Sequence, residues 1–113
     1  MCENQLDELQ ADETLNLIGV FCETAAELAR FACEFPFEAN FVTPLYTSRR
    51  DGALELANEL TCTQKKDAAF DTIIELLIEA AETGEAQGLY HTIEDAEVRE
   101  GILERHPSIA VRH

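Results

Sequence analysis

The residue types that perform most enzyme chemistry are present in this chain, but their spacing matches no common catalytic or metal-binding pattern. There are 17 Glu and 6 Asp residues but only 3 His. An acid and base pair needs carboxyl groups whose pKa values differ through burial, whereas the helical pattern places nearly all of these acids on solvent faces. Neither the Glu-x-x-His motif of metal-binding bundles nor a calcium loop occurs. We therefore expect no enzyme activity, no cofactor and no metal ion.

The chain has four cysteines, which are Cys2, Cys22, Cys33 and Cys62. None of them forms a C-x-x-C pair. Cys22 and Cys33 are eleven residues apart, which separates them by about 16 Å on a helix and forbids a disulfide within it. Cys62, in "LTCTQKK", has two lysines close by that can lower the pKa of its thiol and suit a nucleophile. The commoner role, which we favour, is an inert thiol near the start of a helix.

The free thiols favour a reducing compartment. The opening residues "MCENQLDELQ" are acidic and lack the apolar stretch of a secretory signal. No apolar run reaches the length that a membrane span needs. We therefore expect a cytoplasmic protein.

The most unusual feature is a row of carboxylates in the stretch "DAAFDTIIELLIEAAE", residues 67–82. The row consists of Asp67, Asp71, Glu75, Glu79 and Glu82. Residues four apart are neighbours on a helix, where like charges repel by roughly 0.2–0.5 kcal/mol per pair. At 100° per residue, the row spans an arc of about 120° opposite the apolar stripe of the same helix. Ile78 falls inside this acidic arc, either as an ordinary exposed residue or as a contact.

A second row precedes it, formed by Asp51, Glu55 and Glu59. Two basic clusters, Arg49–Arg50 and Lys65–Lys66, lie at expected helix starts, where the helix dipole disfavours cations. These clusters are therefore expected to pair with acids or with a partner.

The apolar residues recur with a helical period and show almost no period-2 alternation, so the sequence predicts helices rather than strands. We expect helices over residues 12–35, 50–61, 63–83 and 92–105, with a connection over 35–52 in which 41–46 can be helical or briefly extended. Gly84 is expected to stop the third helix. A connection that contains Gly84 and Gly88 should follow it, and Thr92 should cap the last helix. The prediction is an all-α single domain over residues 1–113, a bundle of four to five helices without a substantial sheet. Residues 1–11 and 107–113 are ends that can be flexible.

The first of these helices has apolar residues spaced by three and four, which form a heptad seam. Further apolar residues beside this seam, such as Leu17 and Phe31, make the helix apolar around much of its circumference. Such a helix is buried by several neighbours or by a partner chain. The segment 31–46 that follows is rich in Phe. It either folds over the core or forms an apolar interface, for which the candidate residues are Phe37, Phe41, Tyr46 and Ile78.

The net charge of −15 should repel nucleic acid and anionic membranes and attract basic partners, or it serves solubility alone. Four helical residues rise about 6 Å, and phosphates on one DNA strand advance about 3.4 Å, so acid rows can loosely imitate a nucleic-acid backbone. In size, charge and helical character the chain is similar to phage- and plasmid-encoded DNA mimics and anti-defence inhibitors, some anti-CRISPR proteins among them. No motif carries this similarity.

Two hypotheses follow. In the first, the two acid rows present carboxylates to a basic, nucleic-acid-binding protein partner and inhibit it without catalysis. In the second, the protein is a helical scaffold or assembly protein that associates through segment 31–46, as a homodimer or with another chain, and its acidity maintains solubility.

Overall fold

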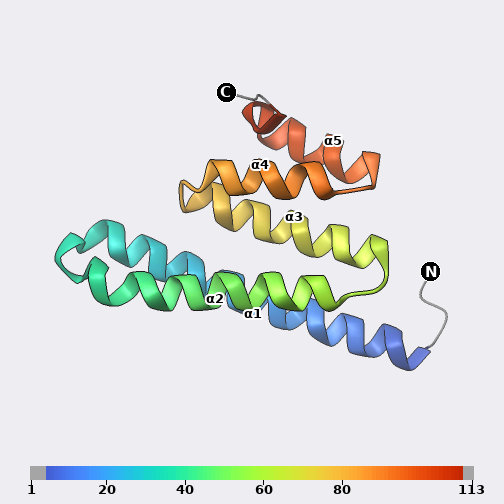
Figure 1. Cartoon of the computed structure of the whole chain (residues 1–113), viewed down its shortest axis with the longest axis horizontal. Helices are drawn as coiled ribbons and strands as arrows, with labels where there is room; N and C mark the ends of the chain where they lie inside the picture. Colours follow the sequence, from blue (N-terminus) through green and yellow to red (C-terminus); the bar gives the residue numbers. More distant parts are fainter. Residues whose placement is uncertain (1–4, 111–113) are drawn as a thin grey trace.

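The computed structural model describes residues 5–110 and is an all-α bundle (Figure 1). Its helices are α1 (Gln5–Glu34), α2 (Ala39–Glu59), α3 (Thr63–Glu79), α4 (Thr83–Thr92) and α5 (Ala96–Arg105). Two 3-10 segments, η1 (Pro36–Glu38) and η2 (Pro107–Ala110), follow α1 and α5. No strand occurs within the described range. The predicted all-α bundle of four to five helices is confirmed.

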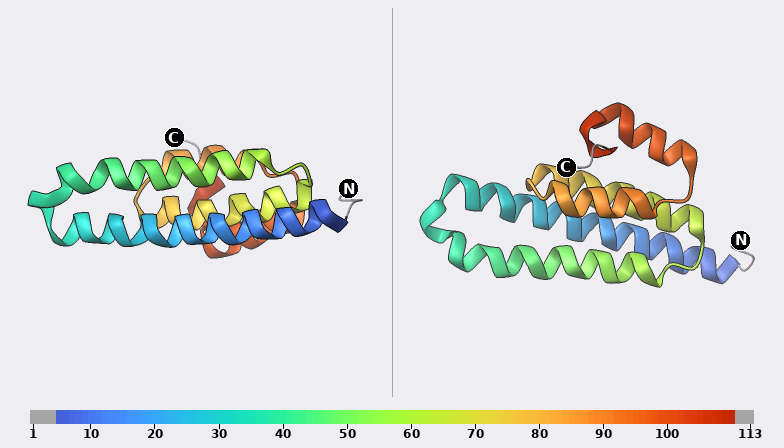
Figure 2. Two further views of the ribbon diagram at one scale, coloured as in Figure 1. Left: turned by 90° about the horizontal axis from the view of Figure 1, so that it is seen from below. Right: turned by 45° about the horizontal axis from the view of Figure 1, so that its top comes forward.

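The long helices α1 and α2 form an antiparallel hairpin, and the other helices lie on one side of it (Figures 1 and 2). Helix α3 packs against both hairpin helices, α4 packs on α3, and α5 is outermost. The closed end of the hairpin extends past the end of α3, which makes the molecule 49 × 32 × 17 Å. In the left view of Figure 2 no other element lies in front of the hairpin. One hairpin face is therefore covered by α3, and no helix within residues 5–110 covers the opposite face.

The core follows the apolar stripe that the sequence predicts for α3. Ile73, Ile74 and Leu77 are completely buried, and each such side chain contributes roughly 1.5–3 kcal/mol to stability through burial. Ile109, in the segment that follows α5, is 1% exposed and is therefore part of the core. Residues 1–4 and 111–113 lie outside the described range. The expected flexible ends thus include residues 5–11 of α1 and the η2 segment.

The expected connection over residues 35–52 is wrong, because α2 runs through most of it and continues to Glu59. Pro44 lies in the second turn of α2, where it removes only one helical hydrogen bond. Val42 and Tyr46 are buried on the same side of the helix as Ala53 and Ala57. This continuous buried face offsets the local cost of the proline.

The expected connection around Gly84 and Gly88 is also wrong, because both glycines lie in α4. Each glycine weakens a helix by about 1 kcal/mol relative to Ala, but Ala86 and Tyr90 are buried and anchor this one. The cap of α5 differs from the prediction too. Asp95, rather than Thr92, accepts hydrogen bonds from the amides of Glu97 at 2.8 Å and Val98 at 3.4 Å.

Helix α3 ends at Glu79, four residues before Thr83, the last residue expected ahead of the stop at Gly84. Ala81 has a φ of 63°, in the left-handed region that usually holds glycine. Its amide donates to the carbonyl of Ile78 at 3.1 Å, and the next amide, of Glu82, donates to the carbonyl of Leu77 at 2.7 Å. These two bonds are the Schellman motif, formed with alanine in the glycine position.

Replacing Ala81 with glycine is expected to raise the free energy of unfolding by about 0.5–1 kcal/mol. The left-handed conformation costs an L-residue roughly 1–2 kcal/mol, and glycine avoids this cost. Glycine also loses more conformational entropy on folding than alanine does, which cancels about half of the gain. Urea titration of both proteins measures the change. The control is Ala68→Gly, at an exposed position inside α3, which should destabilise by about 1 kcal/mol. A destabilised Ala81→Gly variant would contradict this interpretation of the helix end.

Candidate interaction surfaces

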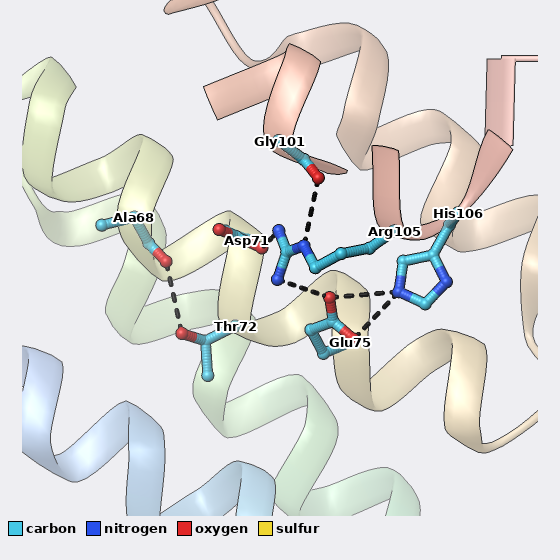
Figure 3. Close-up of polar contacts among 7 residues, drawn as sticks. All are labelled: Ala68, Asp71, Thr72, Glu75, Gly101, Arg105 and His106. Carbon is cyan, nitrogen blue, oxygen red and sulfur yellow. Dashed lines mark hydrogen bonds and ion pairs between the residues drawn. The ribbon is translucent and has the colours of Figure 1, made fainter. Parts of the chain in front are cut away.

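Four of the five acids of the row, Asp71, Glu75, Glu79 and Glu82, are paired with basic side chains from other helices. Figure 3 shows its centre, where Arg105 of α5 lies 2.8 Å from both Asp71 Oδ1 and Glu75 Oε1. Arg105 also donates from Nε to the carbonyl of Gly101 at 3.1 Å, which fixes the guanidinium. His106 Nε2 lies 3.0 Å from Glu75 Oε2. These contacts attach the outermost helix to α3.

The end of the row is paired with the hairpin. Arg30 of α1 lies 2.5 Å from Glu79, and Arg50 of α2 lies 2.6 Å from Glu82. The hydroxyl of Tyr46 donates to the other oxygen of Glu82. Glu82 therefore joins α2 to the segment between α3 and α4. Tyr46 is only 8% exposed, so its prediction as an interface residue is wrong: its ring fills the core.

Asp67, the first acid of the row, does not lie on a solvent face as predicted. It is 2% exposed, and its Oδ2 accepts a hydrogen bond from the amide of Asp95 at 3.0 Å. The reason is that the segment between α4 and α5 packs over the first turn of α3. Ile78 is half-buried and packs against the core. The row is thus a structural seam between helices rather than a free face.

The two basic clusters were expected to lie at helix starts and to pair with acids or with a partner. Lys65 and Lys66 do lie at the start of α3, but the expected position of Arg49 and Arg50 is wrong, because α2 runs through them. Arg50 is paired as described, and Lys65 lies 2.7 Å from Asp12 of α1. Partly exposed pairs of this kind contribute roughly 0–1 kcal/mol each. Their main effect is to neutralise the repulsion that an unpaired row would suffer.

The acids of the hairpin are in a different situation. Asp51 lies 3.0 Å from its neighbour Arg50. Six other exposed carboxylates of α1 and α2 have no ion pair with any side chain that the structure describes, and we call them the hairpin acids. They are Glu13, Glu23, Glu27 and Glu34 of α1 and Glu55 and Glu59 of α2. At 100° per residue, Glu23, Glu27 and Glu34 lie on the side of α1 that faces away from α2. Glu13 points in the same direction as Phe31, and Glu59 in the same direction as Phe41, because the members of each pair are 18 residues, or five turns, apart. Glu55 lies next to Glu59 on this open face of α2.

The hairpin also carries most of the exposed apolar surface. Eight large apolar side chains are exposed among those that the structure describes, and all of them except Leu103 of α5 lie on the hairpin. The seven on the hairpin are Leu17, Val20, Phe31, Phe35, Phe37, Phe41 and Leu45, and we call them the hairpin apolar face. Phe37 is 95% exposed and Phe41 74% exposed. The aromatic residues of segment 35–41 therefore do not fold over the core.

None of the described cysteines forms a disulfide; Cys22 is buried, Cys33 is exposed and Cys62 is partly buried. Cys2 lies outside the described residues. Lys65, expected to act on Cys62, is paired with Asp12. Within residues 5–110, no group of three His, Cys, Asp or Glu side chains is placed to hold a metal ion. None of the described helices has the length and apolar character to cross a membrane.

We expect the free energy of unfolding to fall between about pH 9 and pH 11, partly because the thiol of Cys22 ionises at a lower pH in the unfolded chain than in the folded protein. Burial raises the pKa of its thiol from 9.0 to about 11. A raised pKa stabilises the fold below the unfolded value, and this contribution is lost as the pH rises through the folded value. The shift of about two units corresponds to at most about 3 kcal/mol. Burial and the hydrogen bond to Glu82 also raise the pKa of Tyr46, which adds to the loss at still higher pH.

Urea titrations at pH 8 and at pH 10.5 measure this loss. Cys22→Ala should lose less stability between the two pH values than the unmodified protein does. Cys33→Ala, at an exposed position, should behave like the unmodified protein. Equal losses in all three proteins would contradict the role of Cys22.

Comparison with protein-family models, curated proteins and solved structures gives no match for this chain. Function therefore has to be inferred from the surfaces described above.

Proposed function

We propose that this protein is a non-enzymatic interaction protein that binds a basic protein surface of the kind that nucleic-acid-binding proteins offer to phosphates. By occupying that surface it would act as a nucleic-acid mimic and inhibitor. The observation that supports this proposal is the contrast between the paired acids of α3 and the unpaired hairpin acids. Charges that are not used inside the fold are available to a partner.

Electrostatics supports the same proposal. Glu55 and Glu59 are one turn apart, which separates them by about 6 Å along α2, a spacing that Lys and Arg side chains of a phosphate-binding surface can span. The net charge of −15 produces a field that steers basic partners and repels nucleic acid itself. The proposed setting is the cytoplasm, and the proposed biological class is an anti-defence inhibitor such as those of phages and plasmids, including anti-CRISPR proteins.

Capture of binding proteins from an extract of the native host tests the proposal. The immobilised protein is compared with Glu55→Lys/Glu59→Lys at low and at high salt. The matched control is Glu100→Lys/Glu104→Lys, which reverses two exposed acids of equal spacing on α5. The partner should be lost at high salt and from the hairpin variant, but it should remain on the α5 variant. Equal capture by both variants would contradict the proposal.

A second candidate function is assembly through segment 31–46, and the exposure of Phe37 and Phe41 favours it. Here the protein would be a helical scaffold, and its acidity would maintain solubility. Light scattering of the unmodified protein and of Phe37→Ser/Phe41→Ser decides this. A dimer that becomes a monomer on substitution supports assembly through the segment, and a monomer in both proteins contradicts self-assembly.

A further inference from the structure

We infer that the hairpin apolar face is a docking surface for one amphipathic helix of a basic partner protein. This inference rests on the proposed function and specifies how the partner is held. It follows from the position of the exposed apolar residues, from the length of the strip that they form and from the charges beside it.

The exposed apolar residues of α1 lie on one side of that helix. At 100° per residue, Leu17, Val20, Phe31 and Phe35 fall within an arc of about 60°. The buried residues of α1, such as Ile18 and Cys22, are centred on nearly the opposite direction. Figure 2 shows, in its left view, the hairpin face opposite α3 without any element in front of it. The apolar arc of α1 therefore points out of the bundle.

Helix α2 extends this surface. Phe41 and Leu45 lie one turn apart and are 74% and 56% exposed. At the seam between the two helices, the ring of Phe21 packs against Gly52, where an added Cβ would lie 3.0 Å from the ring. The seam is therefore closed, and an incoming helix would lie along it. Arg49, whose guanidinium lies 5.6 Å from the centre of the Phe21 ring, is the basic residue beside the strip.

The length of the strip fits a helix. Leu17 and Phe35 are 18 residues apart, which corresponds to about 27 Å along α1. Leu17 and Val20 lie at one end of this distance and Phe31 and Phe35 at the other, with Thr24 and Glu27 between them. A partner helix of about 18 residues, or five turns, would cover this distance. Apolar residues at i, i+3, i+4 and i+7 of such a helix would match the strip in width.

The charges beside the strip select the partner. Glu23, Glu27 and Glu34 lie along the outer side of the apolar strip on α1, and Glu55 and Glu59 lie on the same face of α2 as Phe41, so acidic side chains border the strip on both helices. A second copy of this chain would place acids against acids, with a net charge of −15 on each copy. A helix with Lys and Arg on both flanks of its apolar stripe would instead place cations against the hairpin acids. The basic amphipathic helix is therefore the occupant that both the shape and the charge of this surface favour.

The direct test uses a synthetic peptide of about 18 residues made of leucine and lysine, with leucine at i, i+3, i+4 and i+7. A second peptide has the same composition in scrambled order, and binding of both to the full chain is followed by fluorescence anisotropy. The amphipathic peptide should bind about ten-fold more tightly, which is the effect of about 1.4 kcal/mol of apolar contact. Val20→Ser/Phe35→Ser should abolish this preference. Leu103→Ser, at an exposed apolar residue of α5, should preserve it.

Two results would overturn the inference. One is equal affinity for the two peptides, which would show that charge alone attracts them. The other is a dimer of the unmodified protein that Val20→Ser/Phe35→Ser dissociates in light scattering, which would show that a second copy covers the face. In either case, host-partner capture that still depends on Glu55 and Glu59 would leave the proposed function standing, so the two failures are distinguishable.

Discussion

Replacing Leu77 with alanine is expected to lower the free energy of unfolding by about 3 kcal/mol. Leu77 is completely buried in the stripe of α3 that faces the other helices. Truncation removes its favourable transfer from water and leaves a cavity, and together these cost about 2–5 kcal/mol for a buried leucine. The loss would be a large part of the stability of a domain of this size, which is typically 5–15 kcal/mol. Urea titration measures it directly.

Leu103→Ala is the control for this change, because it makes the same truncation at a side chain that is 36% exposed. We expect it to cost well under half as much, since little cavity can form at the surface. Equal losses of stability in the two variants would contradict the conclusion that the face of α3 with Leu77 is buried in the core.

Replacing Arg50 with alanine is expected to cost about 2 kcal/mol. Its guanidinium lies 2.6 Å from Glu82, 3.0 Å from Asp51 and 3.7 Å from Glu85, and its side chain is only 16% exposed. Without it, the carboxylate of Glu82 would stay beside the core with only the hydroxyl of Tyr46 as a partner. Removing one member of a pair that is largely shielded from water costs more than the pair itself contributes.

Arg49→Ala is the matched control, since it removes the same side chain one residue earlier. Arg49 is exposed and lies over the ring of Phe21, a contact that contributes about 0.5–1 kcal/mol. A thermal or urea melt of the two variants should therefore separate them clearly. A loss at Arg49 as large as that at Arg50 would contradict the view that the paired acids form a structural seam.

The fold was predictable where the apolar period was uninterrupted. Helix α3 and most of α1 follow from their spacing because each presents a continuous buried stripe to the bundle. The first half of α2 and all of α4 were missed because Pro44, Gly84 and Gly88 locally favour a break. Those signals cost about 1–3 kcal/mol each, and burial of residues such as Tyr46 and Ala86 outweighs them only in the assembled fold.

The candidate site was predictable in part. The spacing of the acids on α2 and α3 is visible in the chain, but the pairing of the α3 row is not. Its basic partners come from α1, α2 and α5, at separations such as 49 residues for Arg30 and Glu79. The wide apolar circumference of α1 indicated several neighbours or a partner chain, and the structure places α3 on one side and the uncovered hairpin face on the other. Which side remains open depends on tertiary packing alone.

The most direct test of the proposed function is displacement of nucleic acid from the captured host protein. A labelled oligonucleotide is bound to that protein, and its release is followed by fluorescence anisotropy as this acidic protein is added. The predicted result is release by the unmodified protein and by Glu100→Lys/Glu104→Lys, with little release by Glu55→Lys/Glu59→Lys. A complex in which the oligonucleotide stays bound while the unmodified protein also binds would contradict the mimic function.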